Sequence, residues 1–338
     1  MLLEEIGRLE ENREPLRFSE IRDPAPAEKE ILVRVSACGV CHTELDEIEG
    51  RMAPPRLPIV PGHQVVGTVA ALGKNAGRFK FGDRVGVAWI FSACRICKFC
   101  KSGDENLCAD FKATGRDVNG GYAELMTVHQ DFAFALPEVF TDAEAAPLLC
   151  AGAIGYRSLR LSGIADGQNL GLTGFGASAH LVLKMLRHQY PNVKVFVFAR
   201  SERERIFANE LGAVWSGDTT TPSPQKLDAI IDTTPAWTPV VEALKNLEPG
   251  GRLVINAIRK EETDKDVLRG LSYPNHLWLE KEIKSVANVA RNDVSDFLQL
   301  AADMQIKPEV EEYTLQEANR ALVELKAAKI RGAKVLRM

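Results

Sequence analysis

Four closely spaced cysteines limit how this chain can fold more than any other feature of the sequence. They follow the pattern Cys94-x2-Cys97-x2-Cys100-x7-Cys108, and the whole chain of 338 residues contains only seven cysteines. Four loop cysteines without a common role are the alternative, but chance clustering of four from seven is improbable. Four thiolates at this spacing can surround one tetrahedral zinc ion, and such a closed site leaves no position for a substrate. We therefore expect a structural zinc ion whose binding supplies the free energy that orders this charged loop.

Chain length and residue texture predict two domains. A chain of this length exceeds one ordinary core and suits two domains of roughly 150 residues each. Up to about residue 147, short β runs are interrupted by Gly and Pro, which indicates a compact, barrel-like β domain. After Pro147, apolar strand runs alternate with helical stretches, a pattern typical of a parallel sheet covered on both faces. The expected strands are 31–35, 65–71, 84–89, 123–128, 170–173, 193–199, 229–232 and 252–257, and the expected helices are 180–188, 202–211 and 238–247.

Two further expectations concern the start of one helix and the C-terminal tail of the chain. Ser201 and Glu204 have the spacing of a capping box that would open the second helix. The tail, residues 293–338, contains two helical stretches and a final strand-like run, 333–337. We expect the tail to return to the first domain.

Composition and charge exclude several classes of function. Hydrophobic residues make up 45% and charged residues 26% of the chain, which is ordinary for a soluble globular protein. The net charge is −4 with both signs interspersed, so no basic stripe predicts binding to nucleic acid or to an anionic membrane. The first 13 residues hold four glutamates and no sustained apolar run, unlike a signal peptide, and no stretch approaches a membrane span of roughly 20 apolar residues. These features predict a cytoplasmic protein.

Three separated segments carry residues that could form a second metal site. They are Cys41-His42-Thr43, Gly62-His63-Gln64 and Cys150-Ala151-Gly152. A catalytic zinc ion takes three protein ligands and keeps one position open, and two cysteines with one histidine are a known set. Two thiolates would neutralise the charge of the ion yet leave it able to lower the pKa of an alcohol. We therefore predict Cys41, His63 and Cys150 as ligands of a catalytic zinc ion.

Cys38 offers a competing interpretation of the same region. Cys38-x2-Cys41 has the spacing of a redox pair, but no thioredoxin-like βαβ context surrounds it. Buried cysteines are usually small hydrophobic side chains. We expect Cys38 to be one of them.

A glycine-rich turn predicts a dinucleotide-binding site. Gly174, Gly176, Ala177 and Ser178 lie in a G-x-G-x-x-A pattern that follows an expected strand and opens an expected helix. The glycines allow a tight turn and close approach of a pyrophosphate to the helix N-terminus. The motif alone is also met by ordinary glycine turns, and the strand before it with the helix after it favours the cofactor site.

The next strand indicates which nicotinamide cofactor binds. NAD-dependent enzymes usually carry an acidic residue there, which accepts a hydrogen bond from the ribose 2′-hydroxyl. This strand instead ends in Ala199, Arg200 and Ser201. The planar guanidinium of Arg200 can pair with a 2′-phosphate, and the Ser201 hydroxyl can donate to it. NADP(H) is favoured over NAD(H), with a solvated Arg200 and a Ser201 occupied as helix cap as the alternatives.

These motifs together resemble the zinc-containing medium-chain alcohol dehydrogenases. The matching segments are residues 38–43, Pro-Gly-His at 61–63, the four-cysteine loop and Leu-Cys-Ala-Gly at 149–152, in the family's order and spacing. The resemblance covers essentially the whole chain. It implies an α/β protein with a GroES-like β-barrel catalytic domain, 1–148 and 293–338, that carries both zinc sites. It also implies a Rossmann domain, 149–292, with a doubly wound parallel sheet that binds the nicotinamide cofactor.

The resemblance assigns roles to further residues. It implies that Thr43 hydrogen-bonds the substrate hydroxyl and that Trp89 lines the substrate pocket, where a bulky side chain favours small or slender primary alcohols and aldehydes. For Trp89 the alternative is a place in the ordinary core of the β domain. Arg331 resembles the family's C-terminal arginine that reaches the pyrophosphate, and for Arg331 the alternative is a surface position. The remaining residues expected at the cofactor are His42, Thr233, Ala257 and Ile258.

The chain departs from the family pattern beside the catalytic zinc site. Gln64 stands where the family usually has a glutamate, which is thought to approach the zinc during ligand exchange. Asp46 stands where many members have a histidine that ends the proton relay, and a carboxylate with an ordinary pKa of about 4 is a weak base at neutral pH. Glu44 replaces the usual aspartate and should still support His63. Zinc binding should persist, whereas the rate and direction of alcohol oxidation are expected to change.

The resemblance implies a zinc-dependent alcohol dehydrogenase or aldehyde reductase of the EC 1.1.1 type, with two zinc ions per chain and NADP(H) or NAD(H). Its partners would be a small alcohol or aldehyde and further copies of itself in a homodimer or homotetramer. A zinc-free quinone or enoyl reductase of the same fold is one alternative, and it would lack the three predicted ligands. A non-catalytic zinc-binding module is another, which Gln64 and Asp46 favour.

Overall fold

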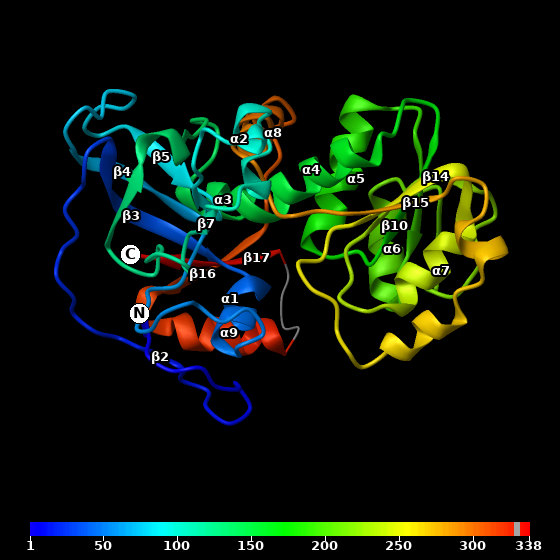
Figure 1. Ribbon diagram of the computed structural model, residues 1–338, viewed down its shortest axis with the longest axis horizontal. Coiled ribbons are helices and arrows are strands. Elements are labelled where there is room, and N and C mark those ends of the chain that lie inside the picture. Colours follow the sequence, from blue (N-terminus) through cyan, green and yellow to red (C-terminus); the bar gives the residue numbers. More distant parts are fainter. Residues whose placement is uncertain (328–331) are drawn as a thin grey trace. The chain divides into compact units, whose positions relative to one another are not determined.

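The computed structural model describes residues 1–327 and 332–338 and divides the chain into two compact units. Unit 1 comprises Met1–Cys150 and Val289–Met338, and unit 2 comprises Ala151–Asn288. Each unit has its own main sheet (Figure 1), and each has buried apolar side chains that form a core. Among the described residues, no helix combines the length and the apolar character needed to cross a bilayer.

Unit 1 is built on a seven-stranded, mostly antiparallel sheet. Its strands lie in the order β16-β17-β3-β4-β5-β9, and β8 also pairs with β3. Inward-facing Ile31, Val33 and Val35 of β3 are buried, as expected for a strand with one face on the core. The bounds are β3 Glu30–Val40, β4 Val65–Leu72, β5 Arg84–Val87, β8 Leu125–His129, β9 Ala133–Ala135, β16 Val310–Thr314 and β17 Ala333–Arg337.

The end of the chain completes this sheet. Strand β17 pairs antiparallel with β3 and parallel with β16, and in Figure 1 the red β17 runs beside the blue β3. Helices α8, Arg291–Asp303, and α9, Ala318–Lys326, belong to the same segment. The C-terminal tail is therefore an integral part of unit 1.

Short elements between these strands position the sites described below. Helix α1, His42–Ile48, follows β3 directly, and all of its residues after His42 are buried. Helix α3, Asp142–Pro147, runs into a π-helical turn, Leu148–Gly152, which carries Cys150. The other short elements are β1 Leu2–Leu3, β2 Leu16–Arg17, β6 Ile90–Ser92, α2 Lys98–Lys101, η1 Glu105–Leu107, β7 Lys112–Ala113, η2 Gln130–Phe132 and η6 Leu315–Glu317.

Unit 2 is built on a six-stranded sheet in which every recorded strand pair is parallel. The order is β12-β11-β10-β13-β14-β15, so the direction of winding reverses between β10 and β13. Continuous apolar runs such as those of β11 and β13 are buried because helices cover the sheet, and the predicted parallel sheet is confirmed. The bounds are β10 Asn169–Thr173, β11 Lys194–Phe198, β12 Trp215–Gly217, β13 Leu227–Asp232, β14 Leu247–Ile255 and β15 Glu282–Ser285.

The helices of unit 2 include α4, Ala153–Ser162, and α5, Ala177–Gln189, which pack against each other. Helix α7, Thr238–Asn246, packs against strand side chains that point to the other face of the sheet. The cluster that they form includes Phe196, Phe198, Ile230 and Leu253. The remaining elements are α6 Glu202–Glu210, η4 Lys265–Gly270 and the π-turn Tyr273–Leu277.

Helix α6 begins where the sequence predicts, but the predicted capping box is wrong. Ser201 occupies the N-cap position, yet its side chain makes no capping hydrogen bond. Ser201 is exposed, so water can satisfy its hydroxyl and the free N–H groups of the first turn. Its hydroxyl is therefore available to a ligand.

Candidate metal and cofactor sites

Cys41, His63 and Cys150 converge within unit 1. Cys41 ends the extended segment before α1, His63 lies in the turn before β4, and Cys150 lies in the π-turn after α3. The Cys41 and Cys150 Sγ atoms are 3.9 Å apart, and His63 Nε2 is 3.3 Å from Cys150 Sγ. Tetrahedral zinc with bonds of about 2.3 Å to sulfur and 2.0–2.1 Å to nitrogen places such atoms about 3.8 and 3.5 Å apart. The three ligand atoms thus fit one zinc ion.

Glu44 orients two of these three residues. Its Oε1 lies 2.5 Å from His63 Nδ1, and its Oε2 accepts a hydrogen bond of 2.8 Å from the Cys41 N–H. Both Glu44 and His63 are buried. The carboxylate occupies Nδ1 and leaves Nε2 facing the cysteines, the arrangement common for metal-bound histidine. The hydrogen bond from Cys150 lowers the pKa of Cys41 well below its ordinary value, despite burial, and this favours the thiolate form that binds metal.

The other predicted catalytic residues differ in what they contact. Thr43 is buried, and its Oγ1 lies 3.7 Å from Cys41 Sγ. Asp46 is also buried and forms an ion pair with Arg51, with 2.5 Å between Oδ1 and Nε. That pairing occupies one oxygen of the Asp46 carboxylate. The sequence argument missed Arg51, because its pairing with Asp46 depends on how the chain turns after α1.

Gln64 is buried beside the site and fills space against the backbone of β3. A Cβ atom at Gly39 would lie 2.6 Å from Gln64 Oε1, so only glycine accommodates this side chain. Glu47 is a second buried residue that the sequence argument missed. Burial raises its pKa well above the ordinary value, with the neighbouring charge of Glu44 as a second cause. Both causes favour the neutral form of the Glu47 carboxyl group.

The four-cysteine loop also brings its thiols together. All four Sγ atoms lie within 4.8 Å of one another, and those of Cys94 and Cys100 are 3.8 Å apart, as tetrahedral zinc requires. The backbone N–H of Cys97 donates to Cys94 Sγ at 3.3 Å, and hydrogen bonds from the N–H groups of Ile96 and Cys97 lower the pKa of Cys94 to about 7. Cys108 Sγ accepts from the N–H groups of Cys94 and Asp110.

An ion pair fastens this loop to helix α8. Glu105, buried within the loop, lies 2.6 Å from Arg291, the first residue of α8. The Arg291 guanidinium also lies over the Phe132 ring, 5.2 Å from its centre. The contact between Glu105 and Arg291 joins residues 186 positions apart in the chain, so local sequence patterns do not reveal it.

In unit 2 the glycine-rich turn joins β10 to α5. Gly174 has a positive φ of 73°, which favours glycine, and a Cβ there would lie 2.9 Å from Thr234 Cγ2. A Cβ at Gly176 would meet no atom within 4 Å, so the protein's own packing does not require glycine there. Space at Gly176, with Ala177 and Ser178 opening α5, suits a pyrophosphate against the helix N-terminus.

The end of β11 presents the residues expected to choose the cofactor. Ala199 is buried, while Arg200 and Ser201 are exposed. Arg205 fixes this turn, because its Nη1 donates to the Ala199 carbonyl at 2.7 Å and to the Arg200 carbonyl at 2.9 Å. The sequence argument missed Arg205. Its position five residues after Arg200, near the start of α6, is the only sequence feature that indicates this role.

The remaining predicted cofactor residues are scattered over both units. Thr233 donates from Oγ1 to the Thr173 carbonyl at 2.9 Å, at the carboxyl ends of β10 and β13. Ala257 is half-buried and Ile258 exposed just after β14. His42 is exposed at the start of α1. Arg331 lies outside the described residues.

Trp89 lies in unit 1 and stacks on Phe111, with ring centres 5.3 Å apart. It is half-buried, and its Nε1 is buried without a hydrogen-bond partner within the described parts of the chain. An unpaired buried indole N–H is unusual for plain core packing. A polar group of a ligand could satisfy it.

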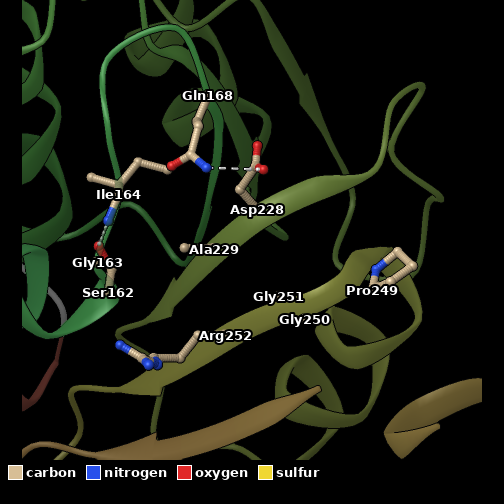
Figure 2. Close-up of a pocket in the computed structure, with 10 residues that line it drawn as sticks. All are labelled: Ser162, Gly163, Ile164, Gln168, Asp228, Ala229, Pro249, Gly250, Gly251 and Arg252. Carbon is tan, nitrogen blue, oxygen red and sulfur yellow. Dashed lines mark hydrogen bonds between the residues drawn. The ribbon is translucent and has the colours of Figure 1, made fainter. Parts of the chain in front are cut away.

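Unit 2 contains a cavity of about 300 Å³, and none of the residues that line it belongs to the glycine-rich turn; Figure 2 shows the lining residues. Gln168, Asp228 and Arg252 line it, together with the turn at Gly250. Gln168 directly precedes β10, Asp228 is the second residue of β13, and Arg252 pairs in register with Ala229 near the start of β13, so the cavity lies toward the amino ends of β10 and β13. Cofactors of parallel α/β sheets bind at the carboxyl ends, and we therefore do not assign this cavity to the cofactor.

Comparison with known proteins agrees with the fold described above. The family model for the alcohol dehydrogenase GroES-like domain matches residues 27–138. A probable alcohol dehydrogenase AdhA from Mycobacterium tuberculosis is 42% identical over 327 residues, covering 95% of this chain and 92% of that protein. An alcohol dehydrogenase from Geobacillus stearothermophilus is 31% identical over 341 residues, covering 97% of both chains.

A solved structure is similar over nearly the whole chain as well. The cinnamyl alcohol dehydrogenase SbCAD4 from Sorghum bicolor matches with a TM-score of 0.80 and 26% identity, covering 94% of this chain and 92% of that one. The predicted α/β fold class, with a GroES-like part and a Rossmann part, is confirmed.

Proposed function

The chain belongs to the zinc-containing medium-chain alcohol dehydrogenase family, and from that premise we propose that it interconverts primary alcohols and aldehydes with two zinc ions and preferably NADP(H). Its membership makes it an oxidoreductase that acts on small alcohols or aldehydes. The observation that carries the finer proposal is the convergence of Cys41 Sγ, His63 Nε2 and Cys150 Sγ. That convergence supports a zinc-dependent enzyme over a zinc-free reductase of the same fold.

The residues of the chain divide the work at this site. When bound, the zinc ion supplies a Lewis acid at the substrate oxygen, and the nicotinamide supplies the hydride donor or acceptor. Cys41, His63 and Cys150 would hold the metal, and Glu44 keeps the His63 ring in the orientation that presents Nε2. The Thr43 hydroxyl, beside Cys41 Sγ, would accept or donate the proton of the substrate oxygen.

The proton path beyond Thr43 must avoid Asp46. Asp46 is already engaged in an ion pair with Arg51. The Thr43 proton therefore has to leave through groups of the bound cofactor or through water. We propose that this slows alcohol oxidation more than aldehyde reduction, because oxidation is the direction that needs a base.

The preference for NADP(H) rests on the end of β11. Arg200 and Ser201 are both exposed there, and the Ser201 hydroxyl is not used as a helix cap. Arg205 holds the backbone of this turn and so fixes where the Arg200 side chain starts. A guanidinium and a hydroxyl are well suited to a 2′-phosphate.

Exchange of one side chain tests this preference. We predict that Arg200→Asp shifts the ratio of kcat/KM for NADPH over NADH by roughly a hundredfold toward NADH, since the loss of a charged hydrogen bond costs about 1.5–3 kcal/mol. Arg203→Asp is the matched control, because it makes the same change of charge at the second residue of α6. An unchanged ratio in Arg200→Asp would refute the assignment of NADP(H).

We propose that Trp89 lines the substrate channel and limits the size of the substrate. If the unpaired indole N–H of Trp89 faces the substrate channel, the bulk of its ring favours slender primary alcohols and aldehydes over bulky secondary ones. Steady-state rates for a series of primary and secondary alcohols, compared between the wild type and Trp89→Ala, test this. Relative gains for bulky substrates in the variant support the proposal, and equal changes across the series contradict it.

We propose a homodimer or homotetramer. Strand β15 is an edge of the unit 2 sheet and exposes all four of its residues. An exposed edge strand with apolar neighbours is a common surface for pairing between copies. The exposed apolar side chains on and before it are Leu271, Tyr273, Trp278, Leu279 and Ile283. Sedimentation of the zinc-loaded protein tests this, and a monomer at micromolar concentration would contradict it.

The direct test of the whole proposal combines metal analysis with turnover. We expect two zinc ions per chain together with NADPH-linked reduction of aldehydes. One zinc ion per chain would favour the zinc-free type of reductase. Two zinc ions without turnover on a broad panel of alcohols and aldehydes would favour a zinc-binding module.

A further inference from the structure

Three polar side chains of unit 2 form a hydrogen-bonded relay. The Asn256 side-chain amide donates to Ser158 Oγ at 2.7 Å and lies 3.4 Å from Ser178 Oγ. Ser158 and Asn256 are buried, and Ser178 is half-buried. One amide NH₂ group thus serves two serine hydroxyls, each of which keeps its own proton to donate elsewhere.

Both hydroxyl protons go to backbone carbonyls just after Cys150. Ser178 donates to the Ala151 carbonyl at 3.1 Å, and Ser158 donates to the Ile154 carbonyl at 2.7 Å. The direction of donation is therefore the same in both branches, from amide to hydroxyl to carbonyl. Such chains of hydrogen bonds strengthen one another in a low-dielectric interior.

The Ser178 branch ends in an irregular segment, whereas Ile154 lies in the regular helix α4. Cys150 and Ala151 lie in the π-turn Leu148–Gly152, which follows a helix that ends at Pro147. Single π-turns are rare and occur frequently at functional sites, and in this one the Ala151 carbonyl is supported by a side chain from outside the turn. The peptide that follows Cys150 obtains such support from Ser178, so the relay helps to fix the direction of the Cys150 side chain.

Close packing of two helices brings Ser178 to this segment. A Cβ atom at Gly155 in α4 would lie 3.2 Å from Ser178 Oγ and 3.1 Å from Val182 Cγ2 in α5. Glycine at this position lets α5 approach α4 closely enough for the Ser178 bond. The bond is therefore built into the helix packing.

The other end of the relay lies in the proposed cofactor site. Ser178 is the second residue of α5 and part of the glycine-rich fingerprint. Asn256 follows β14 directly, and its N–H donates to the Asp232 carbonyl at 2.8 Å, which ties it to the carboxyl end of β13. A cofactor that orders these two segments would also order the relay.

We propose that Asn256, Ser158 and Ser178 are positioning residues that couple binding of the nicotinamide cofactor to the firmness with which Cys150 holds the catalytic zinc ion. The proposal rests on the proposed function, because it needs both ligands to bind at the assigned residues. The coupling is reciprocal by thermodynamic linkage, so the cofactor should retain zinc and zinc should retain the cofactor. It acts through the peptide bond that joins Cys150 to Ala151.

Release of zinc from the purified two-zinc protein to a chromogenic chelator tests the coupling, with and without saturating NADPH. In Ser178→Ala the catalytic zinc should leave about tenfold faster without cofactor, the factor expected for one lost hydrogen bond of about 1.4 kcal/mol. The protection that NADPH gives, taken as the ratio of the two release rates, should also fall severalfold. Ser178→Thr retains the hydroxyl and should restore both quantities.

Ser162→Ala is the matched control. Its hydroxyl donates to the Leu159 carbonyl at 2.6 Å in the same helix α4, but it is outside the relay. This variant should release zinc as the wild type does. Unfolding temperatures of all variants, and a second relay variant, Asn256→Ala, separate loss of the relay from general loss of stability.

The outcomes distinguish this proposal from the proposed function. Wild-type protein that holds two zinc ions and binds NADPH, with release rates and protection unchanged in Ser178→Ala, would overturn the coupling and leave the proposed function standing. Equal acceleration in Ser178→Ala and Ser162→Ala would overturn it too, since the effect would then be structural. Wild-type protein without a second zinc ion, or without NADPH binding, would overturn both.

Discussion

The four thiols proposed to bind a structural zinc ion come from one loop, whereas Cys41 and Cys150 are 109 positions apart and His63 lies 87 positions before Cys150. In the loop, backbone N–H groups of neighbouring residues donate directly to the sulfurs. At the other site, orientation depends on a buried carboxylate, Glu44, and on a π-turn. The loop site can therefore form from local chain alone, while the three-ligand site exists only once the β sheet of unit 1 has formed.

This difference predicts that the two sites fail in different ways. Loss of a ligand at the dispersed site should remove activity and leave the fold, since the sheet holds the remaining residues in place. Loss of a ligand in the loop should affect stability first, because metal binding is the main source of order there.

The largest expected effect is that of Cys150→Ser on turnover. We predict a loss of kcat/KM of more than a thousandfold, roughly 4 kcal/mol or more of transition-state stabilisation, with an unfolding temperature near that of the wild type. Zinc content should fall from two ions per chain toward one. Activity at the wild-type rate would remove Cys150 from the site.

The converse substitution is Cys100→Ser in the loop. Cys100 is buried, and burial raises its pKa to about 12, so only metal coordination would keep it as a thiolate. We predict a stability loss of several kcal/mol from the lost zinc site, measured by urea unfolding, while kcat of the remaining folded protein falls less than tenfold. A variant as stable as the wild type would contradict a structural role for this zinc.

A smaller effect is expected from Glu44→Gln, which keeps the shape of the side chain and removes its charge. Loss of a carboxylate behind a metal-bound histidine typically costs 10–100-fold in metal affinity or activity. We predict that a chelator removes the catalytic zinc roughly 10–100-fold more readily from this variant than from the wild type. Removal of the loop zinc should be unaffected. Equal retention of both ions would show that Glu44 does not support His63.

The smallest effect concerns how helix α1, which follows Cys41, is anchored. Burial opposes the charge of Glu49, but hydrogen bonds from Lys326, the Leu9 N–H and Arg51 lower its pKa to about 2. This group stabilises the fold above the ordinary carboxyl pKa of 4.5, and the stabilisation is lost as the pH falls toward 2.

We therefore predict that Glu49→Gln lowers the free energy of unfolding by about 1 kcal/mol at pH 7, a figure reduced because Arg51 and Lys326 are partly exposed. The difference from the wild type should shrink between pH 4.5 and pH 2. Urea unfolding across this range checks it, and Glu10→Gln, which removes the exposed partner of Lys326, is the control. A difference that grows in acid would contradict the anchoring role.

Sequence reasoning succeeded where the chemistry is local. The Cys94–Cys108 spacing and the strand–glycine–helix order around Gly174 predicted features that depend on neighbours in the chain. The three dispersed ligands were identified only as a set, because each alone resembles an ordinary buried residue. Ser201 shows the limit of a local rule, because the capping pattern is present and the capping bond is absent.

Other features could not be predicted because they depend on tertiary contacts. The pairing of Glu105 with Arg291 and the relay through Asn256 join residues that are far apart in the chain. The capture of Asp46 by Arg51 depends on how the chain turns after α1. Such pairs follow from the fold, and the sequence carries no spacing that reveals them.

Anomalous X-ray scattering at the zinc edge from crystals of the metal-loaded protein measures both sites directly. The account predicts two peaks per chain, one within bonding distance of Cys41 Sγ, His63 Nε2 and Cys150 Sγ, and one at the centre of the four loop thiols. A single peak in the loop, with these three side chains directed apart, would contradict it.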